Sequence, residues 1–454
     1  MCAALAAVAT AAPRIGVAED ATKYANDGGA SLFSTMAQLG LTTNRVTVLW
    51  DPSQPTTIVE KPFLDRFMPV AEASGVQVVF ALYPARSMAV GSSASAADQF
   101  CAFAAQLAGT YPQVTKIIVG NEPNQPRFWQ PQFNGTAPAA GAAYEALLAK
   151  CYDALKAVSP AIDVVGVGLS PRGNDQPKAR SNISRSPVRF IGDMSAAYRA
   201  SGRKAPLMDE FGFHCYPNVN SDALAKGYQW PNIGCVNLDR LKQAIWDGFN
   251  GTGQPTIENG LTILLDEVGW QVDTTALAGY TGTENVPPIA ASTQASIYSS
   301  LVHLVDCDPS ITALHFFHLI DESDRDRFQS GLLTIDGSPR DSAASVQQAI
   351  AQDAGGCTGA SVSWHHSTQV AKAKLLSAKG RSAHLYAEED YTLKATLSAK
   401  GVLAGSVSAS GKAYYDVPLK LPKLKKGKSY TLKVVLSAVQ NPSRTTTVTK
   451  TFIG

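Results

Sequence analysis

The stretch Lys116-Ile-Ile-Val-Gly-Asn-Glu-Pro-Asn124 contains a short apolar run that ends abruptly in polar residues. Such a run is typical of a β-strand buried on both faces of a parallel sheet. Seven similar runs lie at Arg14–Val17, Arg45–Trp50, Val76–Leu82, Asp163–Gly168, Phe211–Tyr216, Leu261–Glu267 and Ile311–Phe317. Ala-rich stretches with apolar residues at helical spacing lie between or after the runs, among them 96–110, 139–158 and 342–352. Eight strands with helical spacers favour an α/β fold closed into a (β/α)₈ TIM barrel.

The sequence changes character after Gly355-Gly356. Four segments then alternate apolar and polar residues and are separated by Ser-Gly and Lys-Gly turns, at Ser382–Tyr386, Tyr391–Leu397, Ala413–Val417 and Ser429–Leu436. This pattern predicts a small antiparallel β-sandwich. A chain of 454 residues is long enough for two domains. We therefore expect a barrel over residues 13–357 and an all-β sandwich over residues 358–454.

Charge is divided unevenly between these two parts. Residues 361–454 contain 15 Lys and Arg against 4 Asp and Glu, which leaves 24 against 33 for the first 360 residues. The basic tail is either an ordinary solvated surface or a surface that meets an acidic cell-wall polymer or a membrane. We expect no nucleic-acid partner, because the basic residues lie in a β-patterned module without a nucleic-acid-binding motif.

The N-terminus and the cysteines indicate a secreted protein. Residues 1–12 are small and apolar and end in an A-x-A-like site, as a signal-peptide remnant does. No other stretch is long and apolar enough to span a membrane. Six cysteines remain beyond Cys2, which is consistent with three disulfides in an oxidising compartment. Pairing in chain order would join neighbouring elements of a barrel, with Cys101 to Cys151, Cys215 to Cys235 and Cys307 to Cys357; buried free thiols are the alternative.

Two of the apolar runs end in a glutamate. Glu122 follows the fourth run and Glu267 ends the seventh. Catalytic groups of (β/α)₈ barrels lie at the C-terminal ends of the strands, where the following loops form a cleft. Carboxyl groups from these two strands could face each other at ~5–5.5 Å, the separation of a retaining glycosidase pair.

These motifs resemble glycoside hydrolase clan A, in particular families 39 and 5. Gly-Asn121-Glu122-Pro-Asn124 resembles the strand-four motif that holds the acid/base, and Glu267-Val-Gly resembles the strand-seven nucleophile. His214-Cys-Tyr216 resembles the His-x-Tyr of strand six, and Arg45 resembles the Arg near the nucleophile. The resemblance covers residues 14 to about 350. Strand eight departs from it, because Phe316-Phe-His318 stands where many clan members have a Trp.

The chemistry explains why these residue types are needed. Glu267 must be ionised to attack the anomeric carbon, and Arg45 with the Tyr216 hydroxyl would favour that form. Glu122 must begin protonated to expel the leaving alcohol, and it then acts as a base. Asn121 is placed to hydrogen-bond the sugar 2-hydroxyl.

Other acids and histidines compete for these roles. Asp266 is the rival nucleophile, but strand alternation is expected to turn it to the opposite face. Asp209-Glu210 mimics a nucleophile motif at the wrong end of a strand, where a salt bridge is the simpler interpretation. We expect no metal and no cofactor, because His315 and His318 fall on opposite faces of a strand and His365-His366 lacks partners.

Aromatic side chains near the strand ends are candidates for stacking on sugar rings. The expected substrate-binding set comprises Arg45, Asn121, His214, Tyr216, Trp129, Trp270, Trp50 and Phe317. Core packing is the alternative for each of the aromatic residues.

Together these features predict a secreted, monomeric hydrolase that cleaves β-glycosidic bonds of an oligo- or polysaccharide with net retention. A β-xylosidase-like or endo-β-glucanase-like activity fits the resemblance equally well. The alternative is a catalytically silent carbohydrate-binding or cell-wall scaffold protein on the same barrel.

Overall fold

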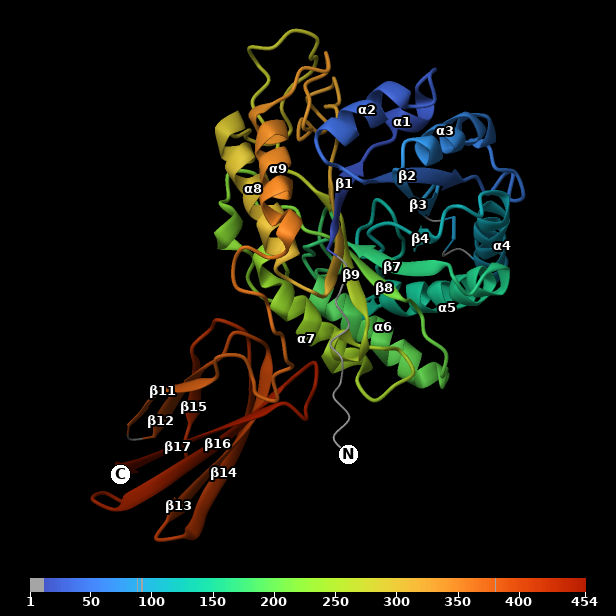
Figure 1. Ribbon diagram of the computed structural model, residues 1–454. Helices are drawn as coiled ribbons and strands as arrows, with labels where there is room; N and C mark the ends of the chain where they lie inside the picture. Colours follow the sequence, from blue (N-terminus) through green and yellow to red (C-terminus); the bar gives the residue numbers. More distant parts are fainter. Residues whose placement is uncertain (1–11, 88, 91–92, 380) are drawn as a thin grey trace, which may run out of the picture.

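The computed structural model of the protein describes residues 12–87, 89–90, 93–379 and 381–454, and it contains a closed parallel barrel followed by antiparallel sheets (Figure 1). The expected signal-peptide remnant over residues 1–12 lies outside the described residues except for Ala12. Within the described residues, no helix is both long and apolar enough to cross a membrane.

Eight strands form the barrel in the order β1-β10-β9-β8-β7-β4-β3-β2, which confirms the predicted TIM barrel. They are β1 (Arg14–Ala18), β2 (Thr43–Trp50), β3 (Gln77–Pro84), β4 (Lys116–Val119), β7 (Asp163–Leu169), β8 (Glu210–His214), β9 (Thr262–Val268) and β10 (Ile311–Phe316). A short hairpin of β5 (Phe133–Asn134) and β6 (Ala137–Pro138) lies in the loop after β4. Small and branched side chains fill the barrel interior, as expected for a packed barrel core: Val79, Ala81, Ile118, Val165, Leu264 and Ala313.

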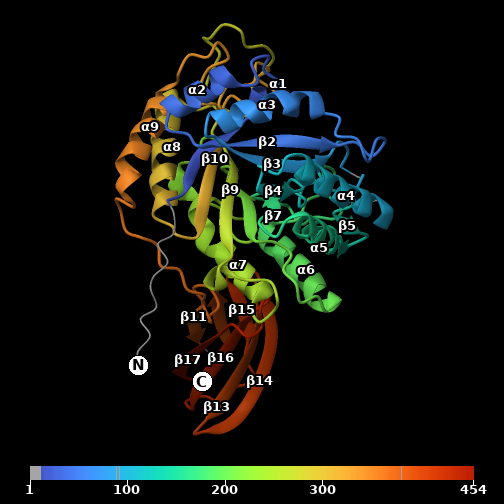
Figure 2. The same cartoon turned by 45° about the vertical axis from the view of Figure 1, so that its right-hand side comes forward.

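Helices surround the barrel and bury their apolar faces against it (Figures 1 and 2). They are α1 (Ala21–Tyr24), α2 (Ala30–Gln38), α3 (Lys61–Ala73), α4 (Ala94–Thr110), α5 (Ala140–Val158), α6 (Pro187–Ser201), α7 (Leu238–Phe249), α8 (Ala291–Asp306) and α9 (Asp341–Gln352). Four short 3₁₀ turns complete the described part of the barrel, η1 (Leu224–Lys226), η2 (Cys235–Asn237), η3 (Ile257–Asn259) and η4 (Asp353–Gly355). Local signals set several ends: Ser93 caps α4 by accepting from the Ala96 amide at 3.1 Å, and Gly202 (φ +70°) ends α6.

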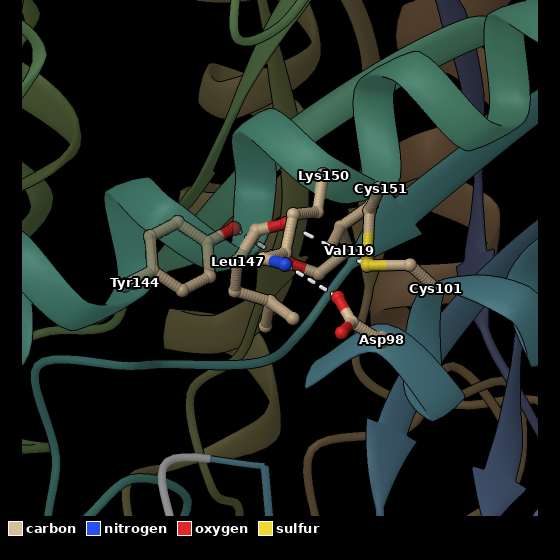
Figure 3. Close-up of a disulfide and its surroundings, with 7 residues drawn as sticks. All are labelled: Asp98, Cys101, Val119, Tyr144, Leu147, Lys150 and Cys151. Carbon is tan, nitrogen blue, oxygen red and sulfur yellow. Dashed lines mark hydrogen bonds and ion pairs between the residues drawn. A yellow bond between two sulfur atoms is a disulfide. The ribbon is translucent and has the colours of Figure 1, made fainter. Parts of the chain in front are cut away.

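Three disulfides join the cysteines in the chain order expected above. Cys101–Cys151 ties α4 to α5, and Cys307–Cys357 ties the end of α8 to the segment after α9. Figure 3 shows the first of these beside Tyr144. The Tyr144 hydroxyl donates to the Val119 carbonyl at 2.5 Å and accepts from the Val167 amide at 2.7 Å. Tyr144 thereby bridges β4 and β7 directly below the loop that carries Glu122.

The C-terminal part is a β-sandwich with its own apolar core. One sheet has the order β11-β12-β15 and the other β14-β13-β16-β17. The strands are β11 (Lys374–Lys379), β12 (Ser382–Tyr386), β13 (Tyr391–Ala399), β14 (Val402–Gly411), β15 (Val417–Lys420), β16 (Ser429–Ala438) and β17 (Thr445–Ile453). The prediction of a strand over Ala413–Val417 is wrong for most of its length, because 413–416 turn and the strand begins at Val417. Asp390 fixes that turn, since its carboxylate accepts from the Ala413 amide at 3.0 Å.

The sandwich packs on α6 and α7 through buried polar contacts (Figure 1). Arg444 pairs with Asp247 of α7 at 2.8 Å, and Asp390 pairs with Arg189 of α6 at 3.0 Å. The His366 ring lies flat on Trp246, with centroids 3.8 Å apart. These contacts brace the sandwich against the side of the barrel.

Candidate active site

The loop after β4 holds Glu122 in a constrained conformation. Gly120 (φ +86°) turns the chain, and Glu122 itself has a φ of +39°, a region that costs energy for a residue with a side chain. The Glu122 amide donates to the Gly168 carbonyl at 2.9 Å. Asn124 anchors the loop from below: its Oδ1 accepts from the Ser170 amide at 3.0 Å and its Nδ2 donates to the Arg185 carbonyl at 3.0 Å. From the sequence, Asn124 is recognisable only as the last residue of the Gly-Asn-Glu-Pro-Asn motif, without this anchoring role.

A β-bulge shapes the end of β9. Between Leu265 and Val268, β9 contains one residue more than both neighbouring strands, as the shifts in register against β8 and β10 show. The expectation that alternation turns Asp266 away from the site is therefore wrong. Asp266 lies inside the barrel with no exposed surface, and Glu267 follows it at the mouth.

His214 connects three carboxylates. Its Nδ1 lies 2.9 Å from Glu122 Oε1 and 3.4 Å from Glu267 Oε2, and its Nε2 lies 3.1 Å from Asp266 Oδ2. The distance between Glu122 Oε1 and Glu267 Oε2 therefore cannot exceed the sum of their distances to His214 Nδ1. The Glu122 and Glu267 side chains stay 16% and 10% exposed, so both can be reached from solvent.

Charge holds His214 in its protonated form. Burial alone would lower its pKa, but the Glu267 and Asp266 carboxylates overcome that effect and raise the pKa of His214 to about 10. Burial raises the pKa of Asp266, but the positive charges of His214 and Arg45 lower it by more. The pKa of Asp266 therefore lies below its usual range. The interior of the site is thus an ionised Asp266–His214 pair.

Arg45 and Tyr216 fix the carboxylate of Glu267. Arg45 Nη2 forms an ion pair with Glu267 Oε1 at 3.0 Å and donates to Asn121 Oδ1 at 2.9 Å, and the Tyr216 hydroxyl donates to Glu267 Oε2 at 2.9 Å. Burial and the Glu267 charge raise the pKa of Tyr216 well above its usual range, which keeps it a neutral donor. Because Asn121 Oδ1 accepts from Arg45, the Asn121 Nδ2 group remains available as a hydrogen-bond donor.

Aromatic rings adjoin this carboxylate. Phe317 lies 6.1 Å from the Tyr216 ring and 5.0 Å from Phe328, which sequence analysis did not single out. Trp270 is 2% exposed, its indole N–H donates to the Asp222 carbonyl at 3.1 Å, and it lines a small hollow with Tyr216 and Tyr228. Phe328 comes from the loop after β10, and nothing in its local sequence marks it as part of the site.

Three expected substrate-binding residues lie in the core instead: Trp50, Trp129 and Trp270. Trp50 is fully buried, its indole N–H donates to the Pro55 carbonyl at 3.2 Å, and its ring stands edge-on to Phe100 of α4. Trp129 is 5% exposed and packs edge-on to Tyr144. The Trp50 ring, at the end of β2, packs against α4, and the Trp129 ring, in the loop after β4, packs against α5.

The competing polar residues take structural positions. Glu210 forms a buried ion pair with Lys116 at the start of β8, away from the mouth. Burial lowers the pKa of His315 to about 3, so this histidine is neutral within the barrel. His318 Nδ1 donates to the Ala18 carbonyl at 2.7 Å. Across the described ranges, no group of three or more His, Cys, Asp or Glu side chains is arranged to hold a metal ion.

A disulfide reinforces the site. The Cys215 amide, between His214 and Tyr216, donates to the Glu267 carbonyl at 3.0 Å, which links the ends of β8 and β9. The bond from Cys215 to Cys235 ties this point to the long loop that follows β8. The backbone that carries His214 and Tyr216 is therefore fixed from two sides.

The charge of His214 predicts a pH-dependent stability. Its pKa rises from 6.5 in the unfolded chain to about 10 in the folded protein, so its contribution to the free energy of unfolding is complete below 6.5 and is lost as pH rises through 10. We expect His214→Asn to lower the melting temperature most at about pH 6 and progressively less toward about pH 10. Thermal unfolding across this range checks the prediction.

The matched control is His365→Asn, because the His365 side chain is 81% exposed. This variant should unfold like the wild type at every pH. A melting-temperature difference for His214→Asn that stays constant across the range would contradict the assignment of the charge.

Comparison with known proteins shows the fold. No protein-family model and no curated protein matches the sequence. A family 39 glycoside hydrolase from Bacteroides cellulosilyticus WH2 superimposes with a TM-score of 0.52 and 14% identity over 90% of this chain and 79% of that chain. A GH39 β-xylosidase from Caulobacter crescentus gives 0.50 and 16% over 86% and 84%. GH5_18 from Streptomyces cattleya, in complex with GlcNAc, gives 0.50 and 16% over 80% and 84%. At these identities the likeness establishes a shared barrel.

Proposed function

We propose that the protein is a retaining glycoside hydrolase that cleaves β-glycosidic bonds of an oligo- or polysaccharide outside the cell. The observation that carries this proposal is the approach of Glu122 and Glu267 to the same nitrogen of His214 at the mouth of the barrel. The two carboxylate oxygens can be separated by no more than the sum of their distances to that nitrogen. This limit agrees with the ~5–5.5 Å between the carboxyl groups of retaining enzymes rather than the ~6.5–9.5 Å of inverting ones, which hold a water between them.

In the first step Glu122 donates its proton to the glycosidic oxygen while Glu267 attacks the anomeric carbon. The bond to the leaving alcohol breaks, and a glycosyl ester forms on Glu267. Arg45 and Tyr216, one on each carboxylate oxygen, hold Glu267 in a fixed orientation before the attack. In the second step Glu122 takes a proton from water, which attacks the same carbon and releases the sugar with its original configuration.

The charges of the site agree with this division of roles. Three carboxylates, Glu122, Asp266 and Glu267, surround two cations, Arg45 and His214. The cluster is electrically balanced when one carboxyl group carries a proton. Glu122 is the most exposed of the three and is therefore the carboxyl group best placed to exchange a proton with solvent.

Asp266 is the competing nucleophile, and its position speaks against that role. Its carboxylate is fully buried below Glu267 and is held by His214 and Arg45. We infer that it orients and charges His214, while Glu267 alone reaches the substrate.

The neighbours in the fold suggest which substrates to test. Since a β-xylosidase and a GlcNAc complex are among the similar structures, the panel should include aryl β-xylosides, β-glucosides and β-N-acetylglucosaminides, together with neutral and acidic β-linked polysaccharides. A catalytically silent binding protein would turn over none of these, although the intact carboxylate pair supports an enzyme.

A mechanism-based label tests the proposal directly. A 2-deoxy-2-fluoro β-glycosyl fluoride of the best substrate should form a stable ester on Glu267, to be located by peptide mass spectrometry. An ester on Asp266, or the release of the inverted sugar as the first product seen by NMR, would refute the mechanism.

A further inference from the structure

The acidic residues of the sandwich are confined to one of its ends. All four side-chain carboxylates in 361–379 and 381–454 belong to the end that faces the barrel or to the turn beside it: Glu388, Glu389, Asp390 and Asp416. Each is paired, Glu389 with Arg444 at 2.8 Å, Asp390 with Arg189 at 3.0 Å, Asp416 with His384 at 3.0 Å and Glu388 with Lys372 at 3.2 Å. Acidic side chains thus serve the barrel end of this domain.

The opposite end carries only cations. The end of β11, the start of β12 and the end of β15 meet there, as the pairing of Lys379 with Ser382 and of Ser382 with Lys420 shows, and the loop over 421–428 follows β15. In the other sheet, the turn between Ala399 and Val402 joins β13 and β14 at the same end. The basic residues of these segments are all exposed, and none forms an ion pair with a described residue: Lys379, Arg381, Lys400, Lys420, Lys423, Lys425, Lys426 and Lys428. We call this group the basic tip.

The loop over 421–428 has a fixed shape that directs its lysines outward. Leu424 packs against the sandwich core, and the Lys425 amide donates to the Tyr430 hydroxyl at 2.9 Å. Gly427 (φ +74°) turns the chain, and its amide donates to the Gly454 carbonyl at 2.9 Å. A preformed loop loses little conformational entropy when it binds.

The outer face of the β14-β13-β16-β17 sheet adjoins the basic tip and is rich in hydroxyl groups. Most of its outward positions are Ser or Thr in the paired register: Ser406, Ser408, Ser410, Thr392, Thr396, Ser398, Ser429, Thr431, Ser437, Thr445, Thr447, Thr449 and Thr451. The other outward positions are Lys394, Lys433 and Val435 and, beside the basic tip, the exposed Leu403 and Ile453. No acidic residue interrupts it. Such a face offers hydrogen bonds and positive charge to an extended polar chain.

From these observations we propose that the basic tip binds an anionic polysaccharide, one whose repeating sugars carry carboxylate, phosphate or sulfate groups. Complementary charge selects the polymer, and the hydroxyl-rich face suits a glycan better than a lipid surface. The described part of this end presents no exposed Trp, Tyr or Phe, but it does expose Val402, Leu403 and Ile453. Lipid vesicles are therefore included as a competing ligand in the test below.

The position of the basic tip indicates that it tethers the enzyme to the polysaccharide and does not guide substrate into the catalytic site. In Figures 1 and 2 the sandwich extends from one end of the molecule, and the yellow and orange loops that follow β9 and β10 lie at the other. Those loops follow the ends of β9, which carries Glu267, and of β10. On the proposed function above, the enzyme bound through its tip keeps its catalytic mouth free, so binding and turnover are separable.

Retention of the full-length protein on immobilised polygalacturonate tests the proposal. We expect binding at low salt that is lost toward ~1 M NaCl, where charges are screened over a few ångströms. Combined replacement of Lys423, Lys425, Lys426 and Lys428 by Gln should weaken retention at least ~10-fold, since each cation near a polyanionic surface contributes several-fold to binding. The wild type should not bind cellulose, a neutral glycan.

A control variant removes the same amount of charge from exposed positions on the barrel, with Arg14, Lys61, Lys150 and Lys204 replaced by Gln. It should bind like the wild type. Glu267→Gln should also bind fully, so the outcome does not depend on catalysis. Equal retention of the tip variant and the wild type would overturn the proposal. So would stronger binding to equimolar phosphatidylcholine–phosphatidylglycerol vesicles or to duplex DNA than to polygalacturonate.

Discussion

Replacement of Glu267 by Ala is expected to lower kcat for every substrate of the wild type by roughly 10⁴-fold or more, since the covalent step loses its nucleophile. Arg45 loses one ion-pair partner and Tyr216 loses one hydrogen-bond acceptor, but Arg45 keeps its hydrogen bond to Asn121. The protein should therefore fold and still bind sugar. Steady-state rates and a binding isotherm for the product separate these two effects.

Adding azide to Glu267→Ala tests from which face of the sugar ring Glu267 attacks the anomeric carbon. A small anion can occupy the space left by the carboxylate and attack the anomeric carbon from that side. Azide should partly restore turnover of an activated aryl β-glycoside and give the α-glycosyl azide, the inverted product, which NMR identifies. A β-glycosyl azide would show that the nucleophile is another residue.

Asp266→Asn is the matched control for this experiment. It removes the negative charge of the adjacent residue but leaves Arg45 and Tyr216 in contact with the Glu267 carboxylate. The variant should still form the covalent ester on Glu267, although more slowly, since His214 loses the partner at its Nε2. Loss of the ester in Asp266→Asn together with its survival in Glu267→Ala would reverse the assignment.

Replacement of Glu122 by Ala should have an effect that depends on the leaving group. For a poor leaving group such as a second sugar, the loss of the general acid should cost roughly 10²–10⁴-fold. A dinitrophenyl glycoside needs no proton to depart, so its first step should stay fast while hydrolysis of the ester slows. We expect a burst of dinitrophenol followed by slow turnover in stopped-flow absorbance.

The same anion distinguishes the two glutamates. In Glu122→Ala, azide needs no general base and attacks the ester on Glu267 from the opposite side, which gives the β-glycosyl azide with retained configuration. Opposite products from the two variants would establish both roles together. A uniform loss of rate for all leaving groups, without a burst, would contradict the role of Glu122 as acid/base.

Sequence reasoning predicted the barrel and the residues at its mouth for one physical reason. Strands buried on both faces must be apolar, so a polar residue that ends such a run, as Glu122 and Glu267 do, marks the end of the strand. The helices over 96–110, 139–158 and 342–352 were likewise visible from their spacing and match α4, α5 and α9 closely.

The features that sequence reasoning missed depend on contacts between distant segments. The place of Asp266 follows from the register of β9 against two other strands, which alternation along one strand does not show. Trp50 is buried because α4 and the loop to Pro55 cover it, and Phe328 joins the site from a loop without local pattern. In the sandwich, the edge strands β14 and β17 consist largely of small polar residues and therefore lack the alternation that reveals a strand.

The extra residue in β9 makes the length of that strand as important as its composition. Two adjacent acids can both face inward only while the backbone is out of step with β8 and β10. Deleting Leu264 or Leu265 would restore strict alternation, so one acid of the pair would point toward the helices. A substitution near this point keeps the register of β9. An insertion or a deletion shifts that register and so changes which side chain the barrel presents to its substrate.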